Sequence, residues 1–388
     1  MKIIRIFSSA LASLFILVII ALEISGNDHL FKAVASTYLV GQTGPSIDEY
    51  HIFPSREVEA AGEIPLRFHR AYGNVKVDEE LIQKIEQYEA VSLLILQKGE
   101  IIFEQYWEGY SSASKTNSFS VAKSIVGLSI GKCIELELIE NLDQAVVDFI
   151  PELKGEFRNE VTIRNLLNMA SGINFDESYG NPLGFMAKAY YGDELLEKTL
   201  QFEAASKPNT EWIYAGGNTI LLAAIVQRCS GQNLSDFVST HFWKPIGASL
   251  PALWNLDADD GIEKAYCCFY SNAHDFARLG QVLLDSGRYN GERVINEAFL
   301  SELRKPVFLE SGIEIPHYGL HWWRMEYRSP NIVYARGILG QYIVVLPELN
   351  AVIVRLGKKR GDKDAFEQPE DLYHYVDLAY DICSQVQE

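Results

Sequence analysis

Strand-forming segments lie near both ends of this 388-residue chain, and segments of helical periodicity fill the middle. The strand-like segments, which are short runs of apolar and β-branched residues, are 91–96, 101–106, 331–335, 342–346 and 351–356. Turn sequences join the first two (Lys98-Gly99) and the last two (347–350), so each pair is predicted to be adjacent and antiparallel. This distribution predicts an α+β fold in which both ends of the chain build one antiparallel β-sheet flanked by helices.

The segments between these strands predict an inserted, mainly helical lobe over about residues 125–265. Apolar residues recur at helical spacing in 120–138, 163–169, 218–228 and 234–242, and again after the lobe in 276–284 and 372–386. Residues 27–85 have few long periodic runs and are predicted to be a lead-in segment that wraps a main domain at 86–388. Folds with two lobes often place their site in the cleft between them.

The N-terminus has the pattern of a membrane-targeting segment. Lys2 and Arg5 precede an apolar run, Ile6–Leu22, which ends at Glu23. The run lies between a signal-peptide core and a full membrane span in length, and no well-placed cleavage site follows it. The pattern favours an uncleaved signal anchor at residues 1–26 over a cleaved signal peptide. We therefore expect the rest of the chain to be exported to the cell envelope, anchored in the inner membrane with a periplasmic catalytic domain if the source is a two-membrane bacterium.

Charge and cysteine content exclude some classes of function. The chain has 34 Lys+Arg against 52 Asp+Glu and a net charge of −18, and nucleic-acid binders need a basic face, so we expect no nucleic-acid partner. The five cysteines, which include no C-x-x-C pair, are Cys133, Cys229, Cys267, Cys268 and Cys383. We interpret all five as buried small apolar side chains, because adjacent cysteines rarely bridge each other; an oxidising compartment would leave disulfides open.

The clearest candidates for chemistry are Ser120 and Lys123. At the start of a helix, a spacing of three residues places both side chains on one face. A serine hydroxyl attacks a carbonyl only after a base removes its proton, and a lysine is such a base when burial or a nearby cation keeps its amine neutral. The apolar residues after Lys123 favour burial, and the free amides at the helix start suit an oxyanion near Ser120. The alternative is an ordinary helix cap followed by a surface lysine.

Two neighbouring segments match catalytic patterns without the right setting. Ser112 and Lys115 have the same spacing as Ser120 and Lys123 but lie in a polar run, which predicts a solvated loop. Residues 127–131 match the nucleophile-elbow formula G-x-S-x-G, which needs a strand before it and a helix after it. They lie inside a helical run instead, so we interpret their small residues as a means of close helix packing.

Two later segments supply candidate partners for Ser120. Tyr214 comes directly before a predicted helix, where it could pass a proton between Ser120 and a leaving group. Gly340 and Gln341 open the strand at 342–346, where glycine lets a substrate lie along the strand edge and the Gln341 backbone N–H is a candidate oxyanion donor. Core packing of the tyrosine and a simple turn at the glycine are the alternatives.

In this order and setting, the motifs resemble those of the penicillin-recognising serine hydrolases. That family includes class C-type β-lactamases, D-alanyl-D-alanine carboxypeptidases, related esterases and aminohexanoate-dimer hydrolases. Ser120 and Lys123 match its serine-x-x-lysine motif, and Tyr214 matches its tyrosine motif in part. Three further stretches resemble family sequences: Asn165–Ile173, Asp275–Gly280 and Gly340–Pro347. The late motifs are nearest in wording to the aminohexanoate-dimer hydrolases.

The chain departs from the family pattern at two positions. Gly216 stands where the tyrosine motif usually ends in asparagine or serine, and Ile338 stands where the third motif usually offers lysine or histidine. That cation helps to hold a substrate carboxylate, so the resemblance implies an esterase or amidase rather than a dedicated β-lactamase. Arg336 is a candidate replacement for the missing cation, provided that its side chain points into the cleft.

The resemblance implies a β-lactamase/DD-peptidase-like fold and hydrolysis of an ester or amide through an acyl-enzyme on Ser120. The expected substrate is a small-molecule ester, amide or peptide, and no cofactor is required. His317 and His321 are four residues apart, but the glutamate of H-E-x-x-H is absent, so no metal site is expected. The alternatives are a penicillin-binding DD-peptidase or β-lactamase acting on cell-wall peptides or β-lactams, and a non-catalytic sensor or scaffold of the same fold. The oligomeric state is left open.

Overall fold

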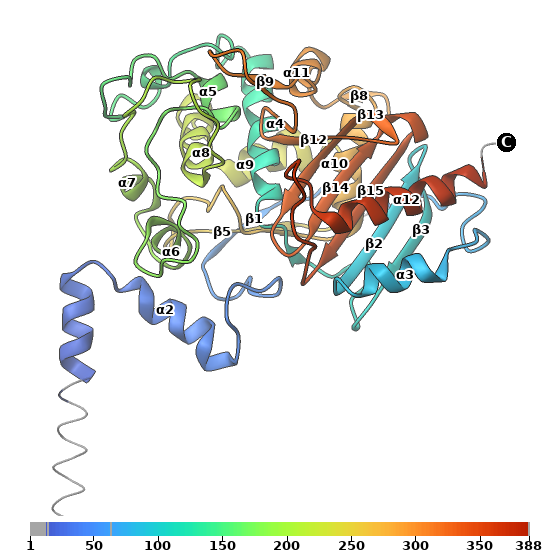
Figure 1. Ribbon diagram of the computed structural model, residues 1–388, viewed down its shortest axis with the longest axis horizontal. Helices are drawn as coiled ribbons and strands as arrows, with labels where there is room; N and C mark the ends of the chain where they lie inside the picture. The colour runs from blue at the N-terminus through green and yellow to red at the C-terminus, as the bar shows by residue number, and fades with distance from the viewer. Residues whose placement is uncertain (1–12, 14, 63, 387–388) are drawn as a thin grey trace, which may run out of the picture.

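The computed structural model describes residues 13, 15–62 and 64–386, and its main feature is a seven-stranded antiparallel sheet (Figure 1). In spatial order the strands are β11 (Tyr318–Gly319), β12 (Trp322–Tyr327), β13 (Ser329–Gly337), β14 (Gln341–Leu346), β15 (Ala351–Gly357), β2 (Ala90–Gln97) and β3 (Glu100–Tyr106). Strand β15 pairs with β2, with Ile353 opposite Ile95, so the two ends of the chain meet inside one sheet. The five predicted strands and the α+β class are confirmed, and β11 and β12 extend the sheet beyond β13.

Both faces of this sheet are covered, which explains why its central strands are buried along their whole length and mainly apolar. Val352 and Val354 point into the core that contains α10 (Ala273–Leu284), whereas Ile353 between them points into the core that contains α12 (Glu370–Ser384). Helix α3 (Glu79–Glu86) packs beside α12. Helix α10 lies so close to the sheet that a Cβ at Gly280 would be 2.5 Å from Val352, so glycine is required there.

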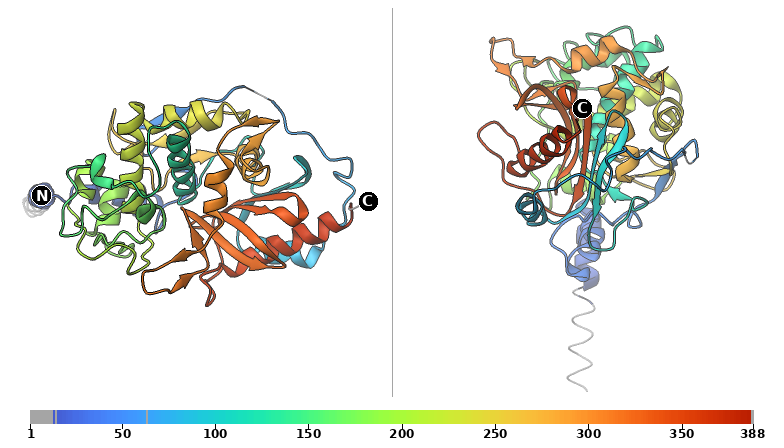
Figure 2. Two further views of the ribbon diagram at one scale, coloured as in Figure 1. Left: turned by 90° about the horizontal axis from the view of Figure 1, so that it is seen from above. Right: turned by 90° about the vertical axis from the view of Figure 1, so that its right-hand side faces the viewer.

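The predicted helical lobe lies beside the sheet, and α4 (Val121–Glu135) stands between the two (Figures 1 and 2). The other lobe helices are α5 (Ile163–Leu167), α6 (Phe185–Tyr191), α7 (Leu195–Thr199), α8 (Gly216–Ser230) and α9 (Leu234–Val238), and a π-helical turn, Ser239–Trp243, follows α9. Helix α4 packs against α8 on one side and against β13 and β14 on the other. The residues at its N-terminus therefore lie where lobe and sheet meet.

Two glycines explain the close packing of α4. A Cβ at Gly127 would lie 3.0 Å from the Leu320 carbonyl oxygen, and one at Gly131 would lie 2.6 Å from the Phe299 ring. Ser129, between them, donates its hydroxyl hydrogen to the Ile125 carbonyl oxygen of the same helix. The interpretation of 127–131 as a packing segment is confirmed.

A second, smaller sheet connects the lead-in segment to the main domain. Its strands, in spatial order, are β1 (Ser55–Val58), β5 (Ala252–Asn255), β6 (Phe269–Ser271) and β4 (Thr116–Asn117). The sequence did not predict these strands, because runs of two to four residues carry almost no periodicity. Strand β4 ends at Asn117, so this sheet leads directly into the Ser120 segment.

The chain at residues 15–24 extends away from the domain (Figure 1). Residues 15–24 are helical, and α2 (His29–Ser36) then packs on α6, with His29 Nε2 2.8 Å from the Pro182 carbonyl oxygen. Residues 1–12 and 14 of the predicted signal anchor lie outside the described residues. Within the part of the chain that the structure describes, no helix has both the length and the apolar character needed to cross a membrane.

Candidate active site

The nucleophile candidate, Ser120, is presented by a tight turn between β4 and α4. Phe119, directly before it, has a left-handed backbone (φ +46°), and the Phe119 N–H donates to Asn117 Oδ1 at 2.9 Å. The Ser118 N–H donates to the Phe269 carbonyl oxygen at 2.8 Å, which ties the turn to β6. On the other side, a Cβ at Gly337 would lie 2.2 Å from the Ser118 carbonyl oxygen. The turn is thus held between the two sheets, and only glycine fits at position 337.

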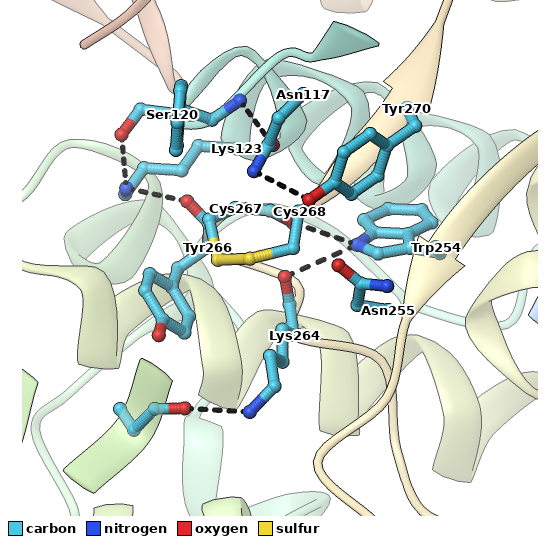
Figure 3. The surroundings of a disulfide bond; sticks show 12 residues. Asn117, Ser120, Lys123, Trp254, Asn255, Lys264, Tyr266, Cys267, Cys268 and Tyr270 are labelled. Atoms are coloured by element: carbon cyan, nitrogen blue, oxygen red, sulfur yellow. Dashed lines mark hydrogen bonds between the residues drawn. A yellow bond between two sulfur atoms is a disulfide. The ribbon is translucent and has the colours of Figure 1, made fainter. Parts of the chain in front are cut away.

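The Lys123 side chain points inward and reaches Ser120, as its position one helical turn along α4 predicted. Its Nζ lies 2.9 Å from Ser120 Oγ and donates to the Tyr266 carbonyl oxygen at 2.9 Å, while the residue is only 1% exposed (Figure 3). A neutral amine has two N–H groups and one lone pair. A lysine in this neutral form that donates one N–H to Tyr266 would keep its lone pair for the serine hydroxyl, which is the arrangement that a general base requires.

Tyr214 completes the predicted group of three. Its ring centroid lies 5.1 Å from Lys123 Nζ. The ring is fixed by edge contacts with Tyr318 (6.0 Å between centroids) and by a tilted contact with Trp323 (5.3 Å). The Ile213 N–H beside it donates to the Met169 carbonyl oxygen, so the loop at 165–173 helps to position the tyrosine. The structure therefore brings Ser120, Lys123 and Tyr214 to one place from α4 and from the loop before α8.

Gly340 and Gln341 lie in the β13–β14 hairpin, and their environment is structural. Gly340 has φ +84°, and a Cβ there would meet the Arg355 guanidinium at 1.9 Å. The Gln341 side chain is fully buried and donates to the Gly357 carbonyl oxygen at 2.6 Å. Among the described residues, Ile338 rather than either of these two lines the cavity beside Ser120.

The cavity next to Ser120 has a volume of about 320 Å³ and a mainly apolar, aromatic wall. It is lined by Pro45, Phe119, Ser120, Tyr179, Met186, Ala187, Tyr190, Tyr191, Tyr266, Cys267 and Ile338. Tyr190 and Tyr191 both lie on this wall, whereas Trp323 packs behind Tyr214 instead. A cavity of this size and character suits a compact apolar group.

Sequence reasoning missed Glu177, a carboxyl group that interacts electrostatically with Lys123. Its Oε1 accepts the Gly216 N–H at 2.5 Å, and a Cβ at Gly216 would lie 3.5 Å from the same oxygen. Burial raises the pKa of the Glu177 carboxyl, and the charge of Lys123 partly offsets this. The polar group that the Gly216 departure removes from the tyrosine motif is thus replaced by a carboxylate from a distant loop, for which the sequence holds no spacing signal.

Arg336 does not supply the missing cation. Its guanidinium stacks on the Trp323 ring, with Cζ 3.3 Å from the ring centroid, and donates to the Glu367 carbonyl oxygen at 2.5 Å. Both contacts hold the side chain against β12 and the segment before α12. The cavity wall at this point is formed by Ile338, which is apolar and 39% exposed.

The interpretation of Cys267 and Cys268 as unbonded side chains was wrong, because they form a disulfide with each other (Figure 3). Neighbouring residues have Cα atoms only 3.8 Å apart, less than in ordinary disulfides. Within the bridge, Cys268 has a left-handed backbone (φ +66°), which turns the chain between the two side chains. Cys133 and Cys383 are unbonded and buried as expected, and Cys229 is unbonded and half-buried.

Comparison with known proteins agrees with this geometry. The Beta-lactamase family model matches residues 79–376. The chain belongs to the beta-lactamase family. This family member is 26% identical over 295 residues to 6-aminohexanoate-dimer hydrolase of Paenarthrobacter ureafaciens, an alignment that covers 71% of this chain and 74% of that protein.

Two solved structures extend the comparison to the fold. A protein of Bacillus anthracis provisionally assigned as a 6-aminohexanoate-dimer hydrolase has a TM-score of 0.71 at 20% identity, covering 88% of this chain and 94% of that one. A family VIII carboxylesterase has a TM-score of 0.62 at 16% identity, covering 82% and 99%. The expected β-lactamase-like fold is confirmed, and the chain is a serine hydrolase of that fold.

Proposed function

We propose that this family member hydrolyses a small ester or amide through an acyl-enzyme on Ser120, with Lys123 as the general base. The observation that carries the proposal is the 2.9 Å contact between Lys123 Nζ and Ser120 Oγ in a buried setting. A sensor or scaffold would have no need to bury a lysine amine against a serine hydroxyl, because burying a polar amine costs free energy. The arrangement therefore favours catalysis over the non-catalytic alternative.

In the proposed reaction, Lys123 accepts the Ser120 proton while Oγ attacks the substrate carbonyl. Within the described residues the Ser120 N–H has no hydrogen-bond partner, so it is free to donate to the oxyanion at the start of α4. The Gln341 backbone N–H remains the proposed second oxyanion donor, in the hairpin whose residue Ile338 lines the cavity. Tyr214 passes the proton to the leaving group, and water then releases the acyl group. The sequence calls for no cofactor.

The cavity favours an apolar acyl group that carries no carboxylate. Its wall is aromatic and, within the described residues, includes no lysine or arginine, while the Glu177 carboxyl lies close to Gly216. An anionic substrate end would find no cation in this wall. Short esters and amides are the proposed substrates, in keeping with the 6-aminohexanoate-dimer hydrolase and carboxylesterase names of the similar proteins. Penicillins and D-alanine termini, which carry a carboxylate, are expected to react poorly.

The test is hydrolysis of p-nitrophenyl butyrate and labelling by a fluorophosphonate probe. We expect Ser120→Ala to abolish both. Ser112→Ala is the matched control, because Ser112 has the same motif spacing in an exposed loop, and it should leave both unchanged. Labelling and turnover that persist in Ser120→Ala would overturn the proposal. Strong labelling by a fluorescent penicillin, with no ester turnover, would favour the DD-peptidase alternative.

We also propose that residues 1–26 anchor the protein in the inner membrane, with the catalytic domain in the periplasm. The support is the apolar run itself, in which Phe15 and Leu17 are each more than 60% exposed. Such side chains are more stable in lipid than in water. Alkaline extraction of membranes tests this proposal: the full chain should stay in the pellet, and a chain lacking residues 1–26 should not. Release of the full chain into the supernatant would contradict it.

A further inference from the structure

A disulfide lies directly beside the general base, and the proposed reaction does not use it. Cys267 lines the cavity next to Ser120, and Cys268 is completely buried behind it. The residue before the bridge is Tyr266, whose carbonyl oxygen accepts a hydrogen bond from Lys123 Nζ (Figure 3). The bridge is thus one residue away from the group that orients the lysine amine.

The carbonyl groups of four consecutive residues, 266–269, connect the nucleophile segment to the small sheet. Tyr266 accepts from Lys123, and Phe269 accepts from the Ser118 N–H at 2.8 Å. The two carbonyls between them turn to β5: Cys267 accepts from Trp254 Nε1, and Cys268 accepts from the Asn255 N–H, both at 3.0 Å. The carbonyls at the two ends therefore face the nucleophile segment and the two in the middle face β5, so the direction of the carbonyls reverses inside the segment.

The reversal occurs at Cys268, which has a left-handed backbone (φ +66°) that residues other than glycine and asparagine rarely adopt. A disulfide between neighbours closes an eight-atom ring that contains the Cys267–Cys268 peptide. The ring restricts the backbone rotations on both sides of that peptide. Opening it would let position 268 relax toward an extended conformation, and the Tyr266 carbonyl would then turn away from Lys123.

We propose that the Cys267–Cys268 disulfide is a positioning group for catalysis: it holds the Tyr266 carbonyl against Lys123, so that the amine lone pair faces Ser120. The inference rests on the proposed function of Ser120 and Lys123. Because the ring acts on the base and not on the cavity wall as a whole, its loss should lower kcat and leave KM nearly unchanged.

The first test opens the bridge in the folded enzyme with the phosphine TCEP. One S–S bond breaks, two thiols form, and the phosphine is oxidised to its oxide with oxygen and protons from water. Cys267 lines the cavity, so the reagent has a path to the sulfur. We expect kcat for p-nitrophenyl butyrate to fall about tenfold, the rate equivalent of one lost hydrogen bond, with KM changed less than twofold. Reoxidation with diamide should restore kcat. Intact mass confirms each redox state.

Variants test the same point without a reagent. Cys267→Ser/Cys268→Ser should show the same fall in kcat and no response to TCEP. Cys267→Ser/Cys268→Gly should recover part of it, since glycine adopts a left-handed backbone freely; a merely structural bridge would not produce that rescue. Cys133→Ser is the control and should behave as wild type. If the variants do not fold, the reduced wild type decides, and if TCEP does not reach the bridge, the variants decide.

An unchanged kcat in either bridge-free form would overturn the inference. The proposed function fails separately, because it predicts loss of activity in Ser120→Ala whatever the state of the disulfide. If the oxidised and the reduced enzyme are equally and fully active, only the positioning role of the disulfide is refuted.

Discussion

Replacing Lys123 with methionine tests the base most directly, because the two side chains are similar in length and only the amine is lost. In the folded protein the lysine is 1% exposed, and its Nζ lies 2.9 Å from both Ser120 Oγ and the Tyr266 carbonyl oxygen. A general base contributes about 10²–10⁴-fold to a rate. We therefore expect Lys123→Met to lower kcat at least about 100-fold, which corresponds to about 3 kcal/mol of transition-state stabilisation.

Stability should change much less than the rate. Removing the amine leaves the buried Tyr266 carbonyl without its Lys123 partner, which costs about 1–3 kcal/mol. The same change also removes a buried amine whose desolvation was itself unfavourable. Because the two effects oppose each other, we expect the melting temperature of Lys123→Met to stay within about 5 °C of wild type.

The assay is steady-state hydrolysis of p-nitrophenyl butyrate, with fluorophosphonate labelling of Ser120 measured in parallel. Lys132→Met is the matched control, since Lys132 lies on the same helix, is also buried, and pairs with Glu135 at 2.9 Å. It should keep wild-type kcat. A Lys123→Met enzyme that folds and retains kcat within tenfold of wild type would refute the general-base assignment.

Three further predictions follow from other positions. Gly337→Ala should abolish activity and lower the melting temperature, because the added Cβ would lie 2.2 Å from the Ser118 carbonyl oxygen; wild-type turnover would contradict this. Ile338→Lys should increase the rate of labelling of Ser120 by a fluorescent penicillin about tenfold, because a cation would then meet the penicillin carboxylate in the cavity; an unchanged rate would mean that position 338 does not contact it. Burial raises the pKa of Glu49 from 4.5 to about 7, so the folded state binds this proton more tightly than the unfolded state, and stability is lost as pH rises from 4.5 to 7. Glu49→Gln should therefore raise the free energy of unfolding by about 1–3 kcal/mol at pH 8 and have little effect at pH 4, as measured by urea unfolding; equal effects at both pH values would contradict it.

The sequence was sufficient for features that depend on local spacing. The contact between Ser120 and Lys123 follows from their separation along a helix, and the strands at 91–96 and 351–356 follow from long apolar runs. The shared sheet followed because strands at both ends of a chain can satisfy their edges by pairing with each other. Tyr214 was found through its setting before a helix. The signals for the Ser120–Lys123 contact, for the single strands and for Tyr214 each lie within about one element of the chain.

Features that depend on long-range geometry could not be predicted in this way. Glu177 reaches Gly216 only because a loop folds over the start of α8, and no spacing records this contact. The choice of Ile338 over Gln341 as the cavity residue depends on the shape of one hairpin. The Cys267–Cys268 bridge is accompanied by a left-handed backbone at Cys268, which the apolar pattern of the segment does not indicate.

Because both ends of the chain share one sheet, the sheet cannot be completed until the C-terminal strands have been synthesised. The Ser120 turn is held on one side by Gly337, which leaves the ribosome long after α4 has done so. Strand β2 likewise cannot pair with β15 until β15 has been synthesised. Pairing between such distant segments is slow, because the chain must close a large loop first. We therefore expect a partly synthesised polypeptide to lack an ordered Ser120 turn until its last strands have joined the sheet.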